Sequence, residues 1–274
     1  MPVAAGPARR PAPASSGSHP SLRHQDHRPW PIPDRPWVGR QVWNDLAFLH
    51  WPVPAALLRP RVPPRLEIQQ FGGSAWIAVT PFLMTGVAAR GLPGVPGASA
   101  FPELNVRTYV ALGDRPGVWF FSLDAGSRLA VWTARMLYHL PYCYAKMSCR
   151  RAERIVEYRS RRPTGEGFEG TYQATGPAVE PVPGTLEHFL TERYCLYAES
   201  RSGALYRAEI HHRPWPLQTG AIEIRRNDML ALHEFPIDGP PAHVHFAARL
   251  EVIVWLPVRL VDLEVNPLLV GAPA

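Results

Sequence analysis

The sequence of 274 residues lacks any apolar run of the ~18 to 20 residues that a membrane-spanning helix needs, because Arg, Asp, Glu or Pro interrupts every candidate. Arg9 and Arg10 near its start are not followed by an apolar stretch, so no secretory signal is expected. Cysteine is scarce, and the three present form no CxxC pair, which is typical of reduced thiols. We therefore expect a cytoplasmic protein without a membrane partner.

The motifs of several catalytic classes are also missing. There is no GxSxG, HExxH or P-loop sequence, so these three classes receive no support. Residues Gly165–Gly170 match GxGxxG, but the stretch before them is Arg161-Arg-Pro-Thr rather than an apolar strand. We predict a turn between two strands at this place and no bound cofactor.

Positive charge exceeds negative charge without gathering in the folded part of the chain. The formal net charge is +6, and residues 1–36 carry +3 of it, with five Arg and two Asp. The arginines between positions 150 and 162 are interleaved with Glu153 and Glu157. Nucleic-acid binders instead concentrate positive charge on one face, so no nucleic-acid partner is expected.

Proline is abundant, with 32 residues, and it punctuates the chain. Residues 1–36 are rich in Pro and show no hydrophobic periodicity, which predicts a disordered tail. We expect a single folded domain over residues 37–265 and a short C-terminal tail over 266–274. Residues 86–100 form a long Gly/Pro/Ala-rich stretch, and loops of this size are often lids or binding loops.

Short strand patterns outnumber helical ones in the predicted domain. The clearest are Leu104–Leu112 and Val118–Leu123, whose Gly- and Pro-rich connection predicts an antiparallel hairpin. Apolar residues at helical spacing predict helices over Arg128–Leu140 and Thr185–Tyr194. No alternation of strands and helices is seen, which favours an antiparallel barrel or sandwich with a few helices.

Four polar residues share one face of the first strand of this hairpin, since side chains alternate with period 2: Glu103, Asn105, Arg107 and Tyr109. Either this face is exposed to solvent, or it lines a polar cavity. In a cavity, Glu103 would pair with an Arg and serve as a general acid/base or a carboxylate clamp. On the second strand, Ser122 and Asp124 share the face of Phe120, and they are either turn-capping residues or part of the same site.

Lysine is almost absent: of 29 Lys and Arg residues, only Lys146 is a lysine. In a predicted strand over residues 142–148 it shares a face with Tyr142. Lys146 is either a surface residue with its amine in water or a desolvated amine that attacks a carbonyl. His243 and His245 share a strand face, but spacing identifies no third ligand, so no metal is predicted.

Several segments together resemble the YqjF-like family, bacterial proteins of unassigned function in the acetoacetate decarboxylase-like superfamily. The resemblance covers about residues 40–262. It implies a β-rich (α+β) fold: a closed, cone-like antiparallel β-barrel with a few short helices and an internal cavity. The segments that carry the resemblance are Trp43 with His50-Trp51-Pro52, Phe71-Gly-Gly with Trp76, Phe101–Val110, Phe120–Ala125 and Leu140-Pro-Tyr142.

The resemblance also implies roles for particular residues. Glu103 falls where the decarboxylase has an active-site glutamate, whereas the decarboxylase's paired lysines would fall at Tyr142 and Cys143. Schiff-base decarboxylation needs an amine, so the fold and cavity are expected to carry over without that chemistry. The expected polar lining is Glu103, Asn105, Arg107, Tyr109, Arg135, Tyr142 and Lys146.

We therefore expect a barrel that binds a small molecule, with lyase, hydratase or cyclase-type chemistry on a carbonyl or carboxylate substrate. Glu103 would transfer the proton, Arg107 or Arg135 would hold the carboxylate, and Tyr142 would donate a hydrogen bond. In another version Lys146 forms an imine. The alternative is a non-catalytic ligand-binding or sensor protein that uses the same cavity, and a homo-oligomer is left open.

Overall fold

The structure is a computed structural model that describes residues 19–261, so the tail predicted over 266–274 and residues 1–18 lie outside the described part. The fold is β-rich with few helices. The strands are β1 (Gly39–Val53), β2 (Glu67–Ile68), β3 (Ala75–Ala89), β4 (Phe101–Leu112), β5 (Arg115–Ala125), β6 (Tyr142–Tyr144), β7 (Lys146–Ala152), β8 (Ile155–Arg161), β9 (Gly167–Ala174), β10 (Cys195–Glu199), β11 (Leu205–His211), β12 (Gln218–Asn227), β13 (His243–Val254) and β14 (Val258–Arg259). The helices are α1 (Ala55–Leu58), α2 (Arg128–Tyr138) and α3 (Leu186–Thr191), with 3-10 turns η1 (Pro20–Arg23), η2 (Arg59–Arg61) and η3 (Ala231–His233).

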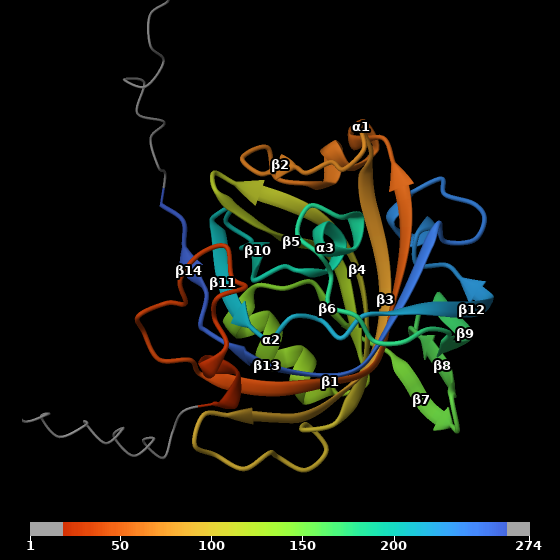
Figure 1. The fold of residues 1–274 in the computed structure, drawn as a ribbon, viewed down its shortest axis with the longest axis horizontal. Coiled ribbons are helices and arrows are strands. Elements are labelled where there is room, and N and C mark those ends of the chain that lie inside the picture. Colours follow the sequence, from red (N-terminus) through yellow and green to blue (C-terminus); the bar gives the residue numbers. More distant parts are fainter. Residues whose placement is uncertain (1–18, 262–274) are drawn as a thin grey trace, which may run out of the picture.

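Strand pairing joins the middle of the sheet into a ring. Strands β11, β10, β5, β4, β3, β1 and β13 are neighbours in this order, and β13 pairs again with β11 (Figure 1). The closing pairs are Ile210 with Val254 and His211 with Ile253. Strands β12, β9, β8 and β7 extend the sheet beyond β13.

The pairing is not antiparallel throughout, in contrast to the expectation from the sequence. Strands β10 and β6 both pair parallel with β5, at Leu196–Val118 and Leu123–Tyr142 respectively. Both strands follow a helix in the chain, α3 and α2 respectively, and a parallel pair needs a connection longer than a hairpin turn. The predicted hairpin of β4 and β5 is present, with its tip between Leu112 and Arg115.

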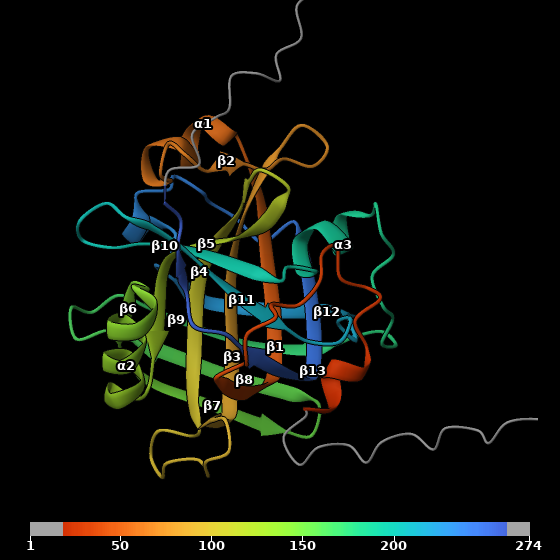
Figure 2. The ribbon, with the colours of Figure 1, turned by 90° about the vertical axis from the view of Figure 1, so that its left-hand side faces the viewer.

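The helices and turns follow the sequence pattern closely. Helix α2 begins after Ser127, whose side chain accepts a hydrogen bond from the Ala130 amide, and it ends at His139 in the left-handed conformation. Figure 2 shows α2 beside β6 along one side of the ring. The GxGxxG match falls on the turn from β8 to β9 and the start of β9. Among the described residues, no helix is long and apolar enough to cross a membrane.

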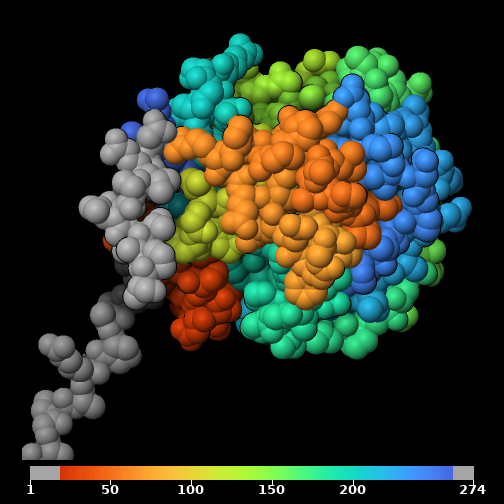
Figure 3. Space-filling view, turned by 90° about the horizontal axis from the view of Figure 1, so that it is seen from above, coloured from red at the N-terminus to blue at the C-terminus, as the bar shows by residue number. Residues whose placement is uncertain are grey.

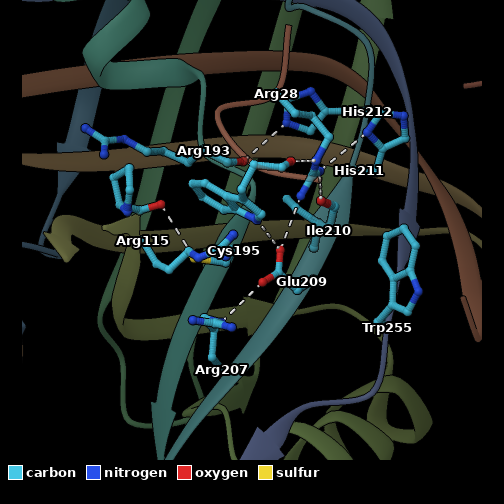
Figure 4. A network of polar contacts seen from close by, with 12 residues as sticks. Arg28, Arg115, Arg193, Cys195, Arg207, Glu209, Ile210, His211, His212 and Trp255 are labelled. Atoms are coloured by element: carbon cyan, nitrogen blue, oxygen red, sulfur yellow. Dashed lines mark hydrogen bonds and ion pairs between the residues drawn. The ribbon is translucent and has the colours of Figure 1, made fainter. Parts of the chain in front are cut away.

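Residues 19–36 pack against the ring, which corrects the prediction of a disordered tail for that part of the chain. Arg28 and Trp30 are both buried against β11. Arg28 Nη2 lies 3.2 Å from Glu209 Oε2 (Figure 4). Trp30 Nε1 donates a hydrogen bond to the same oxygen at 2.9 Å. Composition alone suggested disorder, but the buried carboxylate of Glu209, on a strand distant in the sequence, binds two side chains of this segment and holds it in place.

Candidate functional site

A cavity of about 570 Å³ lies inside the ring, since every strand of the ring contributes to its lining. Most lining side chains are apolar, and the few polar groups among them are typical of a small-molecule site. Polar and charged side chains of the lining include Thr80, Glu103, Asn105, Arg107, Tyr142 and Arg193.

Strand β4 places three of the predicted residues in this cavity. Glu103, Asn105 and Arg107 alternate along β4, all three are buried, and all three line the cavity. Thr80 lies opposite Asn105 on the neighbouring strand β3 and adds a hydroxyl to the same face. The result is a polar stripe on an otherwise apolar wall.

Glu103 is a buried acid with one side-chain hydrogen bond. The Tyr142 hydroxyl donates to Glu103 Oε2 at 2.9 Å. Burial raises the pKa of Glu103 from 4.5 to about 8, the negative charge of Asp124 acts in the same direction, and the hydrogen bond from Tyr142 opposes the rise. At neutral pH the carboxyl group is therefore mostly protonated and able to donate a proton.

Two buried guanidinium groups lie farther along the stripe. Arg107 and Arg193 both line the cavity, with their Cζ atoms 5.7 Å and 5.1 Å from the ring centroid of Tyr109. Arg193 is held by the Phe189 carbonyl and by Gln69, while Arg107 makes a long contact of 3.4 Å to the Leu190 carbonyl and lies over the Phe48 ring. Burial lowers the pKa of Arg193 to about 10, and the like charge of Arg107 acts in the same direction.

Neither guanidinium has a carboxylate partner among residues 19–261. Buried charges are normally paired, because leaving water is costly for an ion. The arrangement thus favours an anion from outside the chain at this end of the cavity.

Further polar atoms on the lining are buried and have no hydrogen-bond partner within the described residues. They are Trp43 Nε1, Thr80 Oγ1, Asn105 Oδ1, Arg107 Nε and Trp215 Nε1. A buried polar atom without a partner costs roughly 1–3 kcal/mol, so native proteins hold few of them. Their concentration on one cavity indicates a ligand with hydrogen-bonding groups of its own.

Tyr109 follows Arg107 on the same face of β4, but it is not part of the cavity lining. Its hydroxyl is 2.6 Å from His50 Nε2, and the pKa of His50 is lowered well below its usual value by burial and by the charge of Arg107. The Tyr109 ring therefore lies next to both guanidinium groups, and an uncharged His50 contacts its hydroxyl. Tyr109 thus contacts two residues of the lining without facing the cavity itself, in contrast to the prediction.

Ser122 and Asp124 face away from the cavity, and a β-bulge is the reason. Val106 pairs with Ser122 and Arg107 with Phe120, so Phe121 is an extra residue in β5 that reverses the alternation. Asp124 forms an ion pair with Arg162, and Ser122 Oγ lies 2.8 Å from His233 Nε2. Their predicted place beside the substrate is corrected to the opposite side of the strand.

Lys146 and Arg135 also lie outside the cavity lining. The predicted strand over 142–148 is interrupted at Ala145: β6 pairs with β5, whereas β7 begins at Lys146 and pairs with β8. The regular alternation that would place Lys146 on the same face as Tyr142 ends at this interruption, and the Lys146 side chain is exposed. Arg135 is exposed on α2 and donates from Nε to the Tyr142 carbonyl at 2.6 Å, so it supports β6 from outside.

Several lining residues were not predicted from the sequence, and Arg193, Thr80 and Trp215 bear most on the chemistry. They come from segments far apart in the chain. Of these three, Thr80 alone could have been found from the sequence, because pairing of the two neighbouring strands places it opposite Asn105.

The two histidines considered as metal ligands lie on β13, with their parallel rings 6.2 Å apart. Among residues 19–261, no group of three or more His, Cys, Asp or Glu side chains is arranged to hold a metal ion. Within this part of the chain, His243 and His245 therefore lack a third side chain placed to complete a metal site.

Comparison with known proteins agrees with the sequence resemblance. Residues 40–251 match the DUF2071 family, described as "Uncharacterized conserved protein". "Uncharacterized protein YqjF" of Bacillus subtilis (strain 168) is 42% identical over 230 residues, which cover 83% of this chain and 94% of that protein.

Solved structures of acetoacetate decarboxylase-like enzymes have the same fold. Acetoacetate decarboxylase from Legionella pneumophila matches with a TM-score of 0.58 at 12% identity, over 91% of this chain and 99% of that chain. The enduracididine biosynthesis enzyme MppR complexed with pyruvate matches with a TM-score of 0.56 at 12% identity, over 83% and 92%. At such identities the likeness concerns the fold alone.

Proposed function

This chain belongs to the DUF2071 family, and from that starting point we propose that it binds a small organic carboxylate inside the ring and exchanges a proton with it through Glu103. The carboxylate would lie against Arg107 and Arg193. The observation that carries the proposal is the pair of buried guanidinium groups without a carboxylate partner in the described residues. Charge-assisted hydrogen bonds from a guanidinium to a carboxylate are among the strongest available to a ligand.

The order of groups along β4 defines the proposed chemistry. Glu103 lies four residues before Arg107, about 13 Å along the strand at ~3.3 Å per residue. Asn105 and Thr80 lie between them and offer hydrogen bonds to a carbonyl or hydroxyl group of the ligand. In its ionised form Glu103 would take a proton from the carbon next to a ligand carbonyl that lies beside it, at some distance from the carboxylate, and in its protonated form it would return a proton to that carbon.

The lining contains no lysine, so none of its residues supplies the amine that an imine needs. The chemistry proposed is therefore proton transfer of the lyase, hydratase or cyclase type. A structural relative, MppR, has been seen complexed with pyruvate, a small carbonyl carboxylate. The three free cysteines support the further expectation of a cytoplasmic location.

Calorimetric titration with 2-oxo carboxylates tests the binding step. The variant Arg107→Met should bind at least about tenfold more weakly, because a charged hydrogen bond contributes roughly 1.5–3 kcal/mol. Arg150→Met is the matched control, since Arg150 is exposed on β7 and outside the lining. Unchanged binding by a folded Arg107→Met protein would refute the proposal.

The runner-up is a ligand-binding or sensor protein without catalysis, which the lysine-free lining favours. Proton NMR in D₂O separates the two functions. Glu103 as a proton-transfer group predicts exchange of the hydrogen on the carbon next to the ligand carbonyl for deuterium, and Glu103→Gln should abolish it. A ligand that binds without any exchange of hydrogen for deuterium would support the hypothesis of a non-catalytic binding or sensor protein.

A further inference from the structure

The cavity has an apolar rim that is exposed to solvent. Four of its lining side chains are 44% to 56% exposed although they are large and apolar: Val95, Leu129, Leu137 and Leu256. They come from the loop after β3, from α2 and from the segment after β13. The polar side chains of the lining, in contrast, are buried or half-buried, with Arg40 as the exposed exception at the rim. The entrance of the cavity is therefore mostly apolar and its interior carries the polar groups, which is the opposite of a site with a polar entrance and an apolar interior.

Strand β4 gives the depth of each group. Phe101 begins the strand and lines the cavity near the rim, and Glu103, Asn105 and Arg107 follow in order toward the other end. From Phe101 to Arg107 the strand covers about 20 Å at ~3.3 Å per residue. The proposed carboxylate position is thus the one farthest from the rim.

The far end of the ring is covered by other elements. Strand β2 pairs with β4 at Val110 and Ala111, beyond Arg107. Figure 3 views the molecule from this end and shows the segment with α1, η2 and β2, coloured orange, spread over it. Helix α3 closes the same end from another side, since Arg107 contacts the Leu190 carbonyl. A ligand therefore enters from the side of α2.

We infer that the ligand is an amphiphilic acid, with its carboxylate at the inner end and an alkyl or aryl body that extends to the rim. The inference rests on the proposed function, which places the carboxylate at Arg107 and Arg193. A cavity of about 570 Å³ lies within the range of drug-sized ligands, ~300–1,000 Å³. Pyruvate would fill a small part of it and leave Leu129 and Leu137 in water.

An apolar body on the ligand also accounts for the composition of α2. Its exposed apolar side chains continue from Leu129 and Leu137, which line the cavity, to Trp132 and Met136, which do not. Isolated apolar side chains at a surface are ordinary, but a contiguous group at a cavity mouth is typical of a binding site. The two kinds of residue on one helix provide a matched pair for a test.

Titration with a homologous series measures the apolar contribution. Pyruvate, 2-oxohexanoate and 2-oxodecanoate share the head group and differ in chain length. Burial of each added methylene should tighten binding about fourfold until the rim is reached. Equal affinity across a series that does bind would overturn the amphiphile while sparing the carboxylate site. If no member binds, the proposed function fails as well.

Two neighbouring variants of α2 locate the apolar body. Leu137→Asp should weaken 2-oxodecanoate at least about tenfold and leave pyruvate unchanged, whereas Met136→Asp should change neither. Leu137 and Met136 are 50% and 62% exposed, so both proteins should fold. Equal effects of the two variants would overturn the inference. So would an oligomer in sedimentation that both variants dissociate without any change in affinity, because the rim would then bind a second copy of this chain.

Discussion

The Tyr142 hydroxyl donates a hydrogen bond to Glu103 Oε2 at 2.9 Å, which joins the short strand β6 to the polar stripe of β4. Both residues are buried, and both line the cavity. Burial and the nearby Glu103 carboxyl raise the pKa of Tyr142 well above 10, so its hydroxyl keeps its proton at every physiological pH. Tyr142 is therefore a fixed donor whose effect falls on the carboxyl group.

Tyr142→Phe should raise the pKa of Glu103 above about 8, because the lost hydrogen bond opposes the effect of burial. The pKa can be followed by carbon NMR of labelled glutamate side chains. Tyr138→Phe is the control, since Tyr138 lines the cavity without a hydrogen bond to Glu103 among the described contacts. A Glu103 pKa that falls in Tyr142→Phe would contradict the geometry.

Glu103 should make the protein less stable as pH rises from about 4.5 to about 8. The native state keeps this proton over that interval while the unfolded chain has lost it, so the free energy of unfolding falls by up to about 1.4 kcal/mol per pH unit and levels off above pH 8. Urea unfolding of Glu103→Gln should lack this decline. The exposed Glu157→Gln should retain it.

Arg28→Met should destabilise the fold by about 3 kcal/mol, since it removes a cation from a buried pair and leaves Glu209 without one of its partners. Denaturant unfolding measures the loss. Arg249→Met breaks an exposed pair with Glu251 and should cost at most about 1 kcal/mol. Equal losses in the two proteins would mean that residues 19–36 add little to stability.

Asp124→Asn should reduce stability and leave ligand affinity unchanged. The variant weakens the buried ion pair with Arg162, on the face of β5 that points away from the cavity. Calorimetric titration and thermal unfolding of one sample measure the two effects. Weaker binding with unchanged stability would place Asp124 at the site after all and contradict the bulge at Phe121.

Local periodicity was sufficient to predict the stripe of Glu103, Asn105 and Arg107, because one regular strand determines which residues share a face. It failed where regularity ends. One extra residue at Phe121 and one unpaired residue at Ala145 each changed the direction of the side chains that follow. Such irregularities depend on the partner strand, which a single stretch of sequence does not contain.

Other parts of the molecule depend on contacts between distant segments. Arg193 and Thr80 come to the cavity through the ring, with no local pattern that marks them. Residues 19–36 read as a tail from their composition, yet Trp30 and Arg28 bind a carboxylate that lies some 180 positions farther along the chain. The family resemblance predicted the β-rich fold and the cavity because it carries these long-range contacts with it.

The position of the lone lysine has a practical consequence. Lys146 is exposed on β7, outside the cavity, and no other lysine competes with it anywhere in the sequence. Apart from the α-amino group, an amine-reactive fluorophore or surface linker therefore has one attachment point on every molecule. Immobilised or dye-labelled protein would present the entrance beside α2 in a uniform way, which suits it to screening compound libraries for the ligand.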